Sequence, residues 1–185
     1  TELIKSRSIL FENYDAEERN TTGFRHANGD FRAEISTETG HAHTGFGYFK
    51  LINNSKAEAY HQYSLTKGHK YRLSTYVKTT ENTQVDIFAR DPVSKEITET
   101  ISFANVPSLI NKVFTFTATN SVMEVGFKFA DSSLANTVLI FDDFMLEEIY
   151  EKPVKQVSED QLNLYNKRYL KMIDKPSEVL VGKEV

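Results

Sequence analysis

Hydrophobic and polar residues alternate with a period of two over most of residues 8–149. In the segment YRLSTYVKT, residues Tyr71, Leu73 and Val77 fall on one side of an extended chain. The segments TQVDIFAR, VFTFTAT, MEVGFKFA and TVLIFDDFML repeat the alternation, and clusters of Gly, Asn, Asp and Ser separate them. Because no helical period intervenes before residue 150, we predict an all-β fold, an antiparallel jelly-roll β-sandwich.

The composition changes after this region. A Pro-bearing segment, predicted as a linker over 151–157, is followed by Ser158 and two acidic residues, which are typical of a helix start. Apolar residues then recur at helical spacing and predict an amphipathic helix over 158–173. They are Leu162, Tyr165, Tyr169, Met172 and Ile173. We therefore expect a sandwich in residues 1–150 and an extension of linker, short C-terminal helix and tail in 151–185. The helix either packs on its own sandwich, leads to a neighbouring domain, or contacts a protein partner.

Composition and charge exclude several classes of function. The net charge is −4, with both signs interspersed, so no basic block is present that could neutralise a run of phosphates, and nucleic acid is not an expected partner. No run approaches the roughly 20 apolar residues that span a bilayer. Cysteine is absent, which removes disulfides, thiolate nucleophiles and cysteine-based zinc sites.

The segment GHAHTGFGYFKL contains two histidines one residue apart, His41 and His43. In a strand these side chains would share a side and could bind zinc together, but the sequence nominates no third ligand by its spacing. The alternative is that the glycines form a turn and the segment is a loop that enters a core strand at Phe49. We predict the loop and no metal site.

Several segments resemble the jelly-roll domains of the carbohydrate-binding-module and galactose-binding-like class. GHAHTGFGYFKL is similar to their HTG segment, LTKGHKYRLSTYVKT to a strand pair, VFTFTAT with VMEVGFKFADS to late strands, and VLIFDDFMLEE to the terminal strand. ILFENYD resembles their opening strand, and the matches follow the family order. The chain lacks the tryptophan that such modules often carry on the ligand face. The resemblance implies a sandwich that binds a glycan or polysaccharide.

The resemblance also implies a structural calcium ion between the first and last strands. Glu12 and Asp142 are the positions that match the family's ligands. Calcium prefers six to eight oxygen ligands, which two carboxylates and loop carbonyls could supply. The alternative is that Asp142 accepts hydrogen bonds from loop amides while Glu12 is solvated. Asp143 is expected on the opposite face of the strand, as a surface charge.

If Tyr71, Leu73, Val85 and Ile87 face the core, the alternate residues form an exposed stripe. An aromatic ring beside charged hydrogen-bonding groups is suited to a sugar, because the ring stacks on its apolar face and the charged groups bind its hydroxyls. We predict the ligand-binding residues on one sheet face, with Tyr76 and Phe88 as stacking platforms. They are Arg72, Tyr76, Asp86, Phe88, Arg90 and Lys128. Alternatively, this face packs on another domain or carries ordinary cross-strand pairs.

No nucleophile elbow, P-loop or His-Glu-x-x-His motif is present, so we do not expect an enzyme. The predicted function is a non-catalytic carbohydrate-binding module of a larger secreted or cell-surface bacterial protein, a location that the resemblance alone implies. The alternative is a structural or adhesive module of a surface or phage-tail assembly, in which the 158–173 helix forms an assembly contact.

Overall fold

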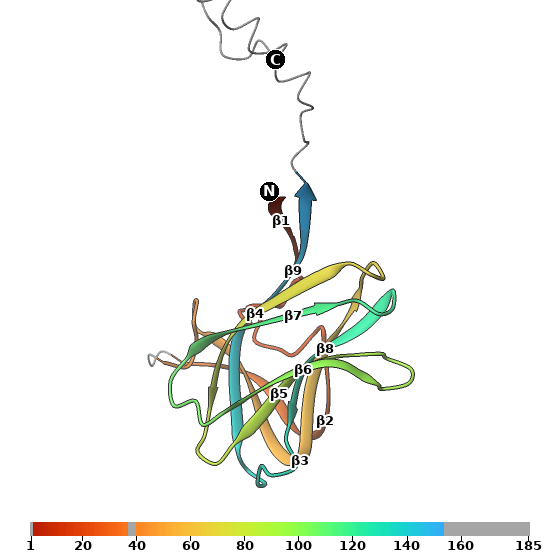
Figure 1. The fold of residues 1–185 in the computed structure, drawn as a ribbon. Helices are drawn as coiled ribbons and strands as arrows, with labels where there is room; N and C mark the ends of the chain where they lie inside the picture. The colour runs from red at the N-terminus through yellow and green to blue at the C-terminus, as the bar shows by residue number, and fades with distance from the viewer. Residues whose placement is uncertain (1, 37–39, 154–185) are drawn as a thin grey trace, which may run out of the picture. The chain divides into compact units, whose positions relative to one another are not determined.

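The computed structural model describes residues 2–36 and 40–153, and every regular element in these ranges is a β-strand. The strands are β1 (Glu2–Ile9), β2 (Phe24–Ile35), β3 (Gly47–Ser64), β4 (Lys70–Thr79), β5 (Gln84–Arg90), β6 (Ile97–Ala104), β7 (Ile110–Thr117), β8 (Val122–Phe129) and β9 (Val138–Pro153) (Figure 1). The prediction of an all-β, antiparallel sandwich is confirmed, since the registered strand pairs run antiparallel.

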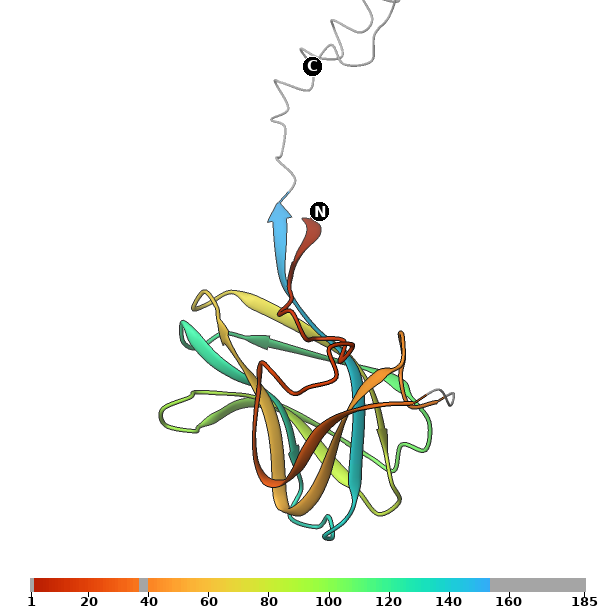
Figure 2. The ribbon, with the colours of Figure 1, turned by 180° about the vertical axis from the view of Figure 1, so that it is seen from behind.

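The strands form a nearly closed sandwich in the order β6-β5-β8-β3-β9-β4-β7, with β2 also paired to β3 and β1 to β9 (Figures 1 and 2). The long strand β3 joins the two layers: residues 49–52 pair with β9, and residues 58–64 pair with β8. At the ends of this path, the amide of Thr117 in β7 donates to the carboxylate of Glu99 in β6 over 3.2 Å. A side chain therefore links the two terminal strands.

Phenylalanine fills the interior in place of the absent tryptophan. Phe127 and Phe141 lie 4.6 Å apart by ring centroid, and Phe49 lies 5.0 Å from Phe141, with all three fully buried. The predicted inward residues of β4 and β5 belong to the same core. The period-two interpretation of these strands is therefore confirmed for their core-facing side.

Residues 4–150 form one compact unit. Strand β9 continues to Pro153, three residues into the predicted linker. The predicted helix over 158–173 lies outside the described residues and stays a prediction. Among the residues that the structure describes, no helix is long and apolar enough to cross a membrane.

Candidate functional site

The six predicted ligand-binding residues do not share one sheet face. Arg72 and Tyr76 lie on β4, which pairs with β7 and β9. Asp86, Phe88 and Arg90 lie on β5, which pairs with β6 and β8, and Lys128 follows on β8. Because β4 and β5 belong to different layers, the prediction of one continuous stripe is wrong. Alternation predicts which side of a strand a residue faces, but not which strands are neighbours.

The two residues on β4 are occupied by local partners. The guanidinium of Arg72 donates through Nε to Glu147 of β9 over 2.6 Å, and its side chain is partly exposed. The ring of Tyr76 stacks on His43, with centroids 3.4 Å apart and planes 8° from parallel. Tyr76 therefore supports the loop at residues 40–46.

The outer face of β3, β8 and β5 gathers the other four predicted residues. The strand register aligns Tyr60, Gly126 and Phe88 in one row across these strands. The row on one side contains Glu58, Lys128 and Asp86, and the row on the other contains Gln62, Glu124 and Arg90. We call this surface the β3–β8–β5 face.

Gly126 brings the two aromatic residues of this face close to the sheet. A Cβ atom at this position would lie 2.1 Å from the carbonyl oxygen of Ala59 and 2.6 Å from the Cβ of Tyr60, so no larger residue fits without a shift of the backbone. Glycine in a strand often marks such a close approach. Gly126 and its two aromatic neighbours, Tyr60 and Phe88, are all buried.

Phe88 is buried, which corrects its prediction as an exposed stacking platform. Its relative exposure is 0% because the guanidinium of Arg90 covers the ring, 4.6 Å from the ring centroid. The same guanidinium lies 4.7 Å from the ring centroid of Tyr60, and the ammonium of Lys95 lies 5.4 Å from it. The guanidinium of Arg90 thus lies over both rings of this face, whereas the ammonium of Lys95 lies over Tyr60.

A network of ion pairs connects the charges of this face. Arg90 donates to both carboxylate oxygens of Glu58, over 2.9 and 3.0 Å, and its Nε donates to Glu124 over 2.8 Å. Lys95, from the loop between β5 and β6, donates to both oxygens of Glu124 over 3.0 Å. The side chains of Arg90 and Glu124 are 5% and 1% exposed, while that of Lys95 is 50% exposed. Two cations and two carboxylates therefore balance one another.

Sequence reasoning missed Tyr60, Glu58 and Lys95 as members of this face. The polar run NNSK at residues 53–56 looks like a turn, yet β3 continues through it. Asn53 stabilises this irregular part of the strand, because its side-chain oxygen accepts a hydrogen bond from the backbone amide of Ala57 over 2.9 Å. The one signal in the sequence is the pair of small apolar residues Ala57 and Ala59, because two core-facing residues at this spacing place Tyr60 on the opposite side of the strand.

The two aspartates of β9 anchor the loop at residues 40–46. The carboxylate of Asp142 accepts from the amides of His43 and Thr44, over 2.7 and 3.1 Å, and from the amide of Asp143. The carboxylate of Asp143 contacts Nδ1 of His43 at 2.6 Å and accepts from the Thr44 hydroxyl. Both aspartates are buried, so the prediction of Asp143 as a surface charge is wrong.

A bulge in β9 explains this correction. The register between β4 and β9 shifts opposite Ser74 and Tyr76, and Asp143 has a positive φ of 52°. Phe141 and Phe144, three residues apart, consequently both enter the core. The extra residue of a bulge re-aims neighbouring side chains, which sends both carboxylates toward the loop.

Burial first, and then the neighbouring charge of Asp143, raise the pKa of Asp142 to about 7, although the backbone amides oppose the rise. His41 and His43 have different surroundings: His43 meets Asp143, while the ring of His41 packs 5.4 Å from Tyr48. Within the described residues, no three His, Asp or Glu side chains form a group that could hold a metal ion.

The two predicted calcium ligands therefore differ in their surroundings. Asp142 already accepts hydrogen bonds at both carboxylate oxygens, and Glu12 is exposed in the loop after β1. This arrangement matches the alternative in which Asp142 binds loop amides, and these residues as they stand do not form a calcium cage. Calcium binding at Glu12 and Asp142 stays a prediction.

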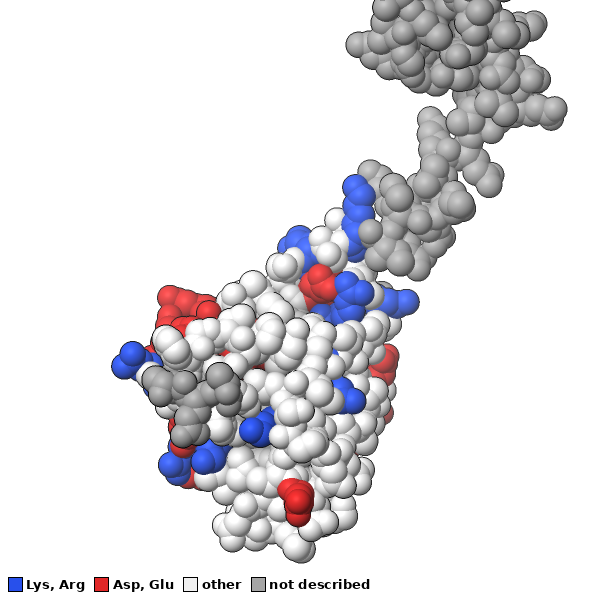
Figure 3. Space-filling view, turned by 90° about the vertical axis from the view of Figure 1, so that its left-hand side faces the viewer, with Lys and Arg blue, Asp and Glu red and all other residues white. Residues whose placement is uncertain are grey.

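Charged side chains on the side of the molecule seen in Figure 3 are of both signs. Lys and Arg lie interspersed with Asp and Glu around a broad uncharged area. The surface in this view therefore does not present a patch of one sign.

The fold is shared with carbohydrate-binding modules. A family 61 carbohydrate-binding module in complex with β-1,4-galactotriose is 12% identical, with a TM-score of 0.57, over 79% of this chain and 99% of that one. A family 16 carbohydrate-binding module is 19% identical, with a TM-score of 0.55, over 72% and 96% of the two chains. No protein-family model matches the sequence, and no curated protein matches it. The resemblance to carbohydrate-binding-module jelly rolls is thus confirmed at the level of fold.

Similar domains also occur inside larger proteins. The active domain of tailspike protein 4 of bacteriophage CBA120 is 12% identical, with a TM-score of 0.55, over 76% of this chain but only 21% of that one. The shared fold therefore occurs both in binding modules and in parts of enzymes.

The ion pairs of Arg90 generate a first prediction. Arg90→Met should lower the free energy of unfolding by about 3–5 kcal/mol, because it leaves the buried carboxylate of Glu124 with only an exposed lysine as partner. The double variant Arg90→Met/Glu124→Gln should recover part of the loss. Urea unfolding measures both, and Arg72→Met, at a partly exposed pair, is the control with an expected loss below about 1 kcal/mol. Equal losses for Arg90→Met and Arg72→Met would contradict the prediction.

The raised pKa of Asp142 predicts a pH dependence of stability. Between about pH 4 and 7 the folded state keeps a proton on Asp142 that the unfolded chain releases, so this group's contribution to stability falls as the pH rises through that window. Urea unfolding from pH 4 to 8 should therefore show a steeper fall for the wild-type chain than for Asp142→Asn. Parallel curves for the two proteins would show that Asp142 does not titrate in this range.

Calcium binding has its own test. If an ion bridges Glu12 and Asp142, EGTA lowers the melting temperature relative to added calcium, and either Glu12→Gln or Asp142→Ala abolishes the difference. Thermal unfolding of the three proteins measures this. Identical melting temperatures of the wild-type chain with chelator and with calcium would exclude the site.

Proposed function

We propose that this chain is a non-catalytic carbohydrate-binding module whose ligand lies on the β3–β8–β5 face. The observation that carries the proposal is the pair of polar rows, Glu58–Lys128–Asp86 and Gln62–Glu124–Arg90, that flank Tyr60, whose own exposure is 9%. The shared fold with carbohydrate-binding modules supports it.

Sugar binding at this face would use polar groups that are already fixed in position. Arg90 is held by two carboxylates and two aromatic rings, so it loses little conformational freedom when a hydroxyl binds nearby. Asp86, held by the Ser102 hydroxyl over 2.5 Å, extends the polar surface toward β6. Rigid polar groups of this kind recognise the hydroxyl pattern of a sugar.

Lys95 is the element that a ligand would displace. Its half-exposed ion pair with Glu124 is of the kind that contributes about 1 kcal/mol or less, so exchanging it for sugar hydroxyls costs little. Movement of Lys95 also removes a cation that lies over the Tyr60 ring. The part of the Tyr60 ring that Arg90 leaves uncovered can then contact the apolar face of a sugar.

Recognition rather than catalysis accounts for the carboxylates of the face. Glu58 and Glu124 are both engaged by Arg90, which suits them to accept hydrogen bonds from a ligand and not to transfer protons. Placement in a larger secreted or cell-surface bacterial protein belongs to this proposal and stays a prediction from the resemblance.

A second candidate is a structural or adhesive module. The similar fold within a bacteriophage tailspike favours this alternative. In that case the β3–β8–β5 face would contact protein, and the 158–173 helix would supply an assembly contact.

A glycan panel separates the two candidates. The full chain should bind at least one neutral glycan in a panel that includes β-1,4-galactan and xylan. Tyr60→Ala should weaken this binding about fivefold or more, because stacking on an aromatic ring contributes about 1 kcal/mol or more. Tyr76→Ala is the matched control, since it removes the same side chain from the other layer. Failure to bind any glycan of a broad panel, or equal effects of the two variants, would overturn the proposed site.

A further inference from the structure

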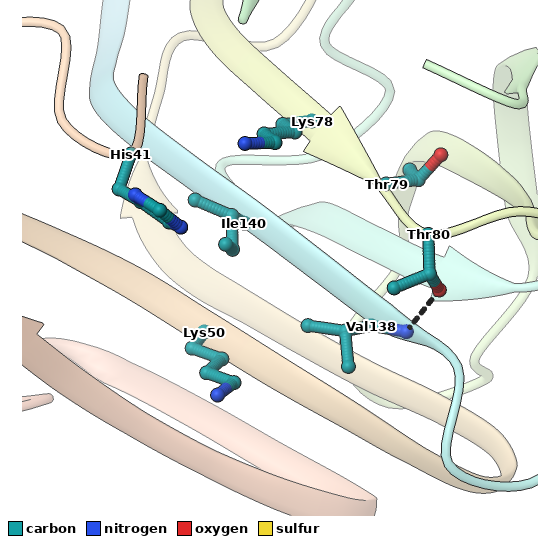
Figure 4. Close-up of a pocket in the computed structure, with 7 residues that line it drawn as sticks. All are labelled: His41, Lys50, Lys78, Thr79, Thr80, Val138 and Ile140. Carbon is teal, nitrogen blue, oxygen red and sulfur yellow. Dashed lines mark hydrogen bonds between the residues drawn. The ribbon is translucent and has the colours of Figure 1, made fainter. Parts of the chain in front are cut away.

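A pocket opens on the outer face of β3, β9 and β4, in the layer away from the β3–β8–β5 face (Figure 4). Its volume is about 240 Å³. Within residues 2–36 and 40–153, it is lined by His41, Lys50, Lys78, Thr79, Thr80, Val138 and Ile140. The volume lies below the roughly 300–1,000 Å³ of drug-sized sites, so the pocket holds a single ring-sized group.

The strand register places two lysines on either side of an apolar residue. Ile140 of β9 pairs with Lys50 of β3 and with Lys78 of β4. Neighbouring strands lie about 4.8 Å apart, so the backbones of the two lysines are separated by roughly 10 Å. Figure 4 shows the side chain of Lys78 extending toward the side of the pocket on which the ring of His41 lies next to Ile140.

The charges around the pocket are not balanced as they are on the β3–β8–β5 face. Among the residues that the structure describes, no carboxylate lines the pocket. Lys50 has a distant partner in Glu34, at 3.8 Å, which also accepts from the Tyr48 hydroxyl. Lys78 donates to the carbonyl of Gly40 over 3.3 Å, and within residues 2–36 and 40–153 it forms no ion pair. The half-buried ammonium of Lys78 therefore favours an anion.

His41 supplies a second, independent feature. Its Nδ1 atom is buried and has no hydrogen-bond partner in the part of the chain that the structure describes. Buried polar atoms are rarely left without a partner, because such an atom costs about 1–3 kcal/mol. A ligand with hydroxyl groups in this pocket would satisfy the ring nitrogen.

The residues at the floor of the pocket indicate what the uncharged part of the ligand must be. Ile140 and Val138 present aliphatic surface, and the backbone amide of Val138 is already occupied by the Thr80 hydroxyl over 2.9 Å. A phosphate ion would place a fully hydrated anion on this surface, which is unfavourable. A carboxylate carried on a ring with an apolar face would instead satisfy the lysines and the floor together.

We infer that this pocket binds a hexuronate, an acidic sugar whose carboxylate lies between Lys50 and Lys78 and whose ring lies on Ile140. The site is separate from the β3–β8–β5 face and does not depend on it. It assigns to the chain a second binding surface, selective for acidic over neutral sugars.

Isothermal titration calorimetry of the full chain with tetragalacturonate, free D-galacturonate and neutral β-1,4-galactotetraose tests this inference. We expect heat with tetragalacturonate at the pocket, and at least a tenfold weaker affinity for Lys78→Met, because a hydrogen bond to a charged group contributes this much. Lys78→Arg should retain most of the affinity. Lys70→Met, an exposed lysine of the same strand, is the matched control and should leave the affinity unchanged.

The outcomes distinguish this site from the proposed one. Tyr60→Ala should leave acidic-sugar binding intact, and Lys78→Met should leave binding of any neutral glycan intact. Binding of free D-galacturonate without tetragalacturonate would assign the pocket to small organic acids and overturn its role as a glycan site. Equal affinity for the acidic and neutral tetrasaccharides, no heat with either acid, or an unaffected Lys78→Met variant would overturn the inference itself.

Discussion

The bulge in β9 at Asp142 and Asp143 determines how the loop at residues 40–46 lies on the sandwich. By changing the phase of the strand, it lets Phe141 and Phe144 both enter the core and sends both carboxylates to the loop. The carboxylates then hold the backbone of His43 and Thr44 and the ring of His43. The same loop places His41 at the edge of the pocket that contains Lys50 and Lys78. Without the bulge, one aspartate would point into the phenylalanine core, where an unpaired carboxylate is strongly unfavourable.

The two outer faces of the sandwich differ in how far their charged side chains are buried and paired. On the β3–β8–β5 face, Arg90 and Glu124 are almost fully buried, and such charges are tolerated only when they are paired and hydrogen-bonded. Lys95 and Glu58 complete the pairing at the rim. On the β3–β9–β4 face, Lys78 is only half-buried and keeps contact with water, so it needs no carboxylate of its own. Burial thus explains why one set of charges is internally balanced and the other is open to a ligand.

The sequence predicts which residues face the core better than it predicts which outward residues are exposed and lie together. The inward positions of β4 and β5, such as Leu73 and Ile87, follow from alternation alone, because a pleated strand sorts its side chains whatever lies beside it. The burial of Phe88 could not be predicted, since it depends on the side chain of Arg90, which covers the ring, and on Tyr60 from another strand. The prediction for Asp143 was wrong for a local reason. A bulge inserts one residue into the strand, and the sequence FDDF contains no glycine that would indicate a bulge.

The strand register also explains why the two proposed sites differ in ligand charge. Along β3, outward residues before the irregularity at 53–56 lie against β9, whereas those after it lie against β8. Lys50 therefore has the apolar Ile140 as its neighbour, while Glu58 has Lys128 and, beyond it, Asp86. Two cations beside aliphatic surface, here Lys50 and Lys78, attract an anion with an apolar body, whereas alternating charges cancel at a distance and act only through hydrogen bonds at contact range. One long strand that changes partners midway can thus present two surfaces, one selective for charge and the other for the pattern of hydroxyls.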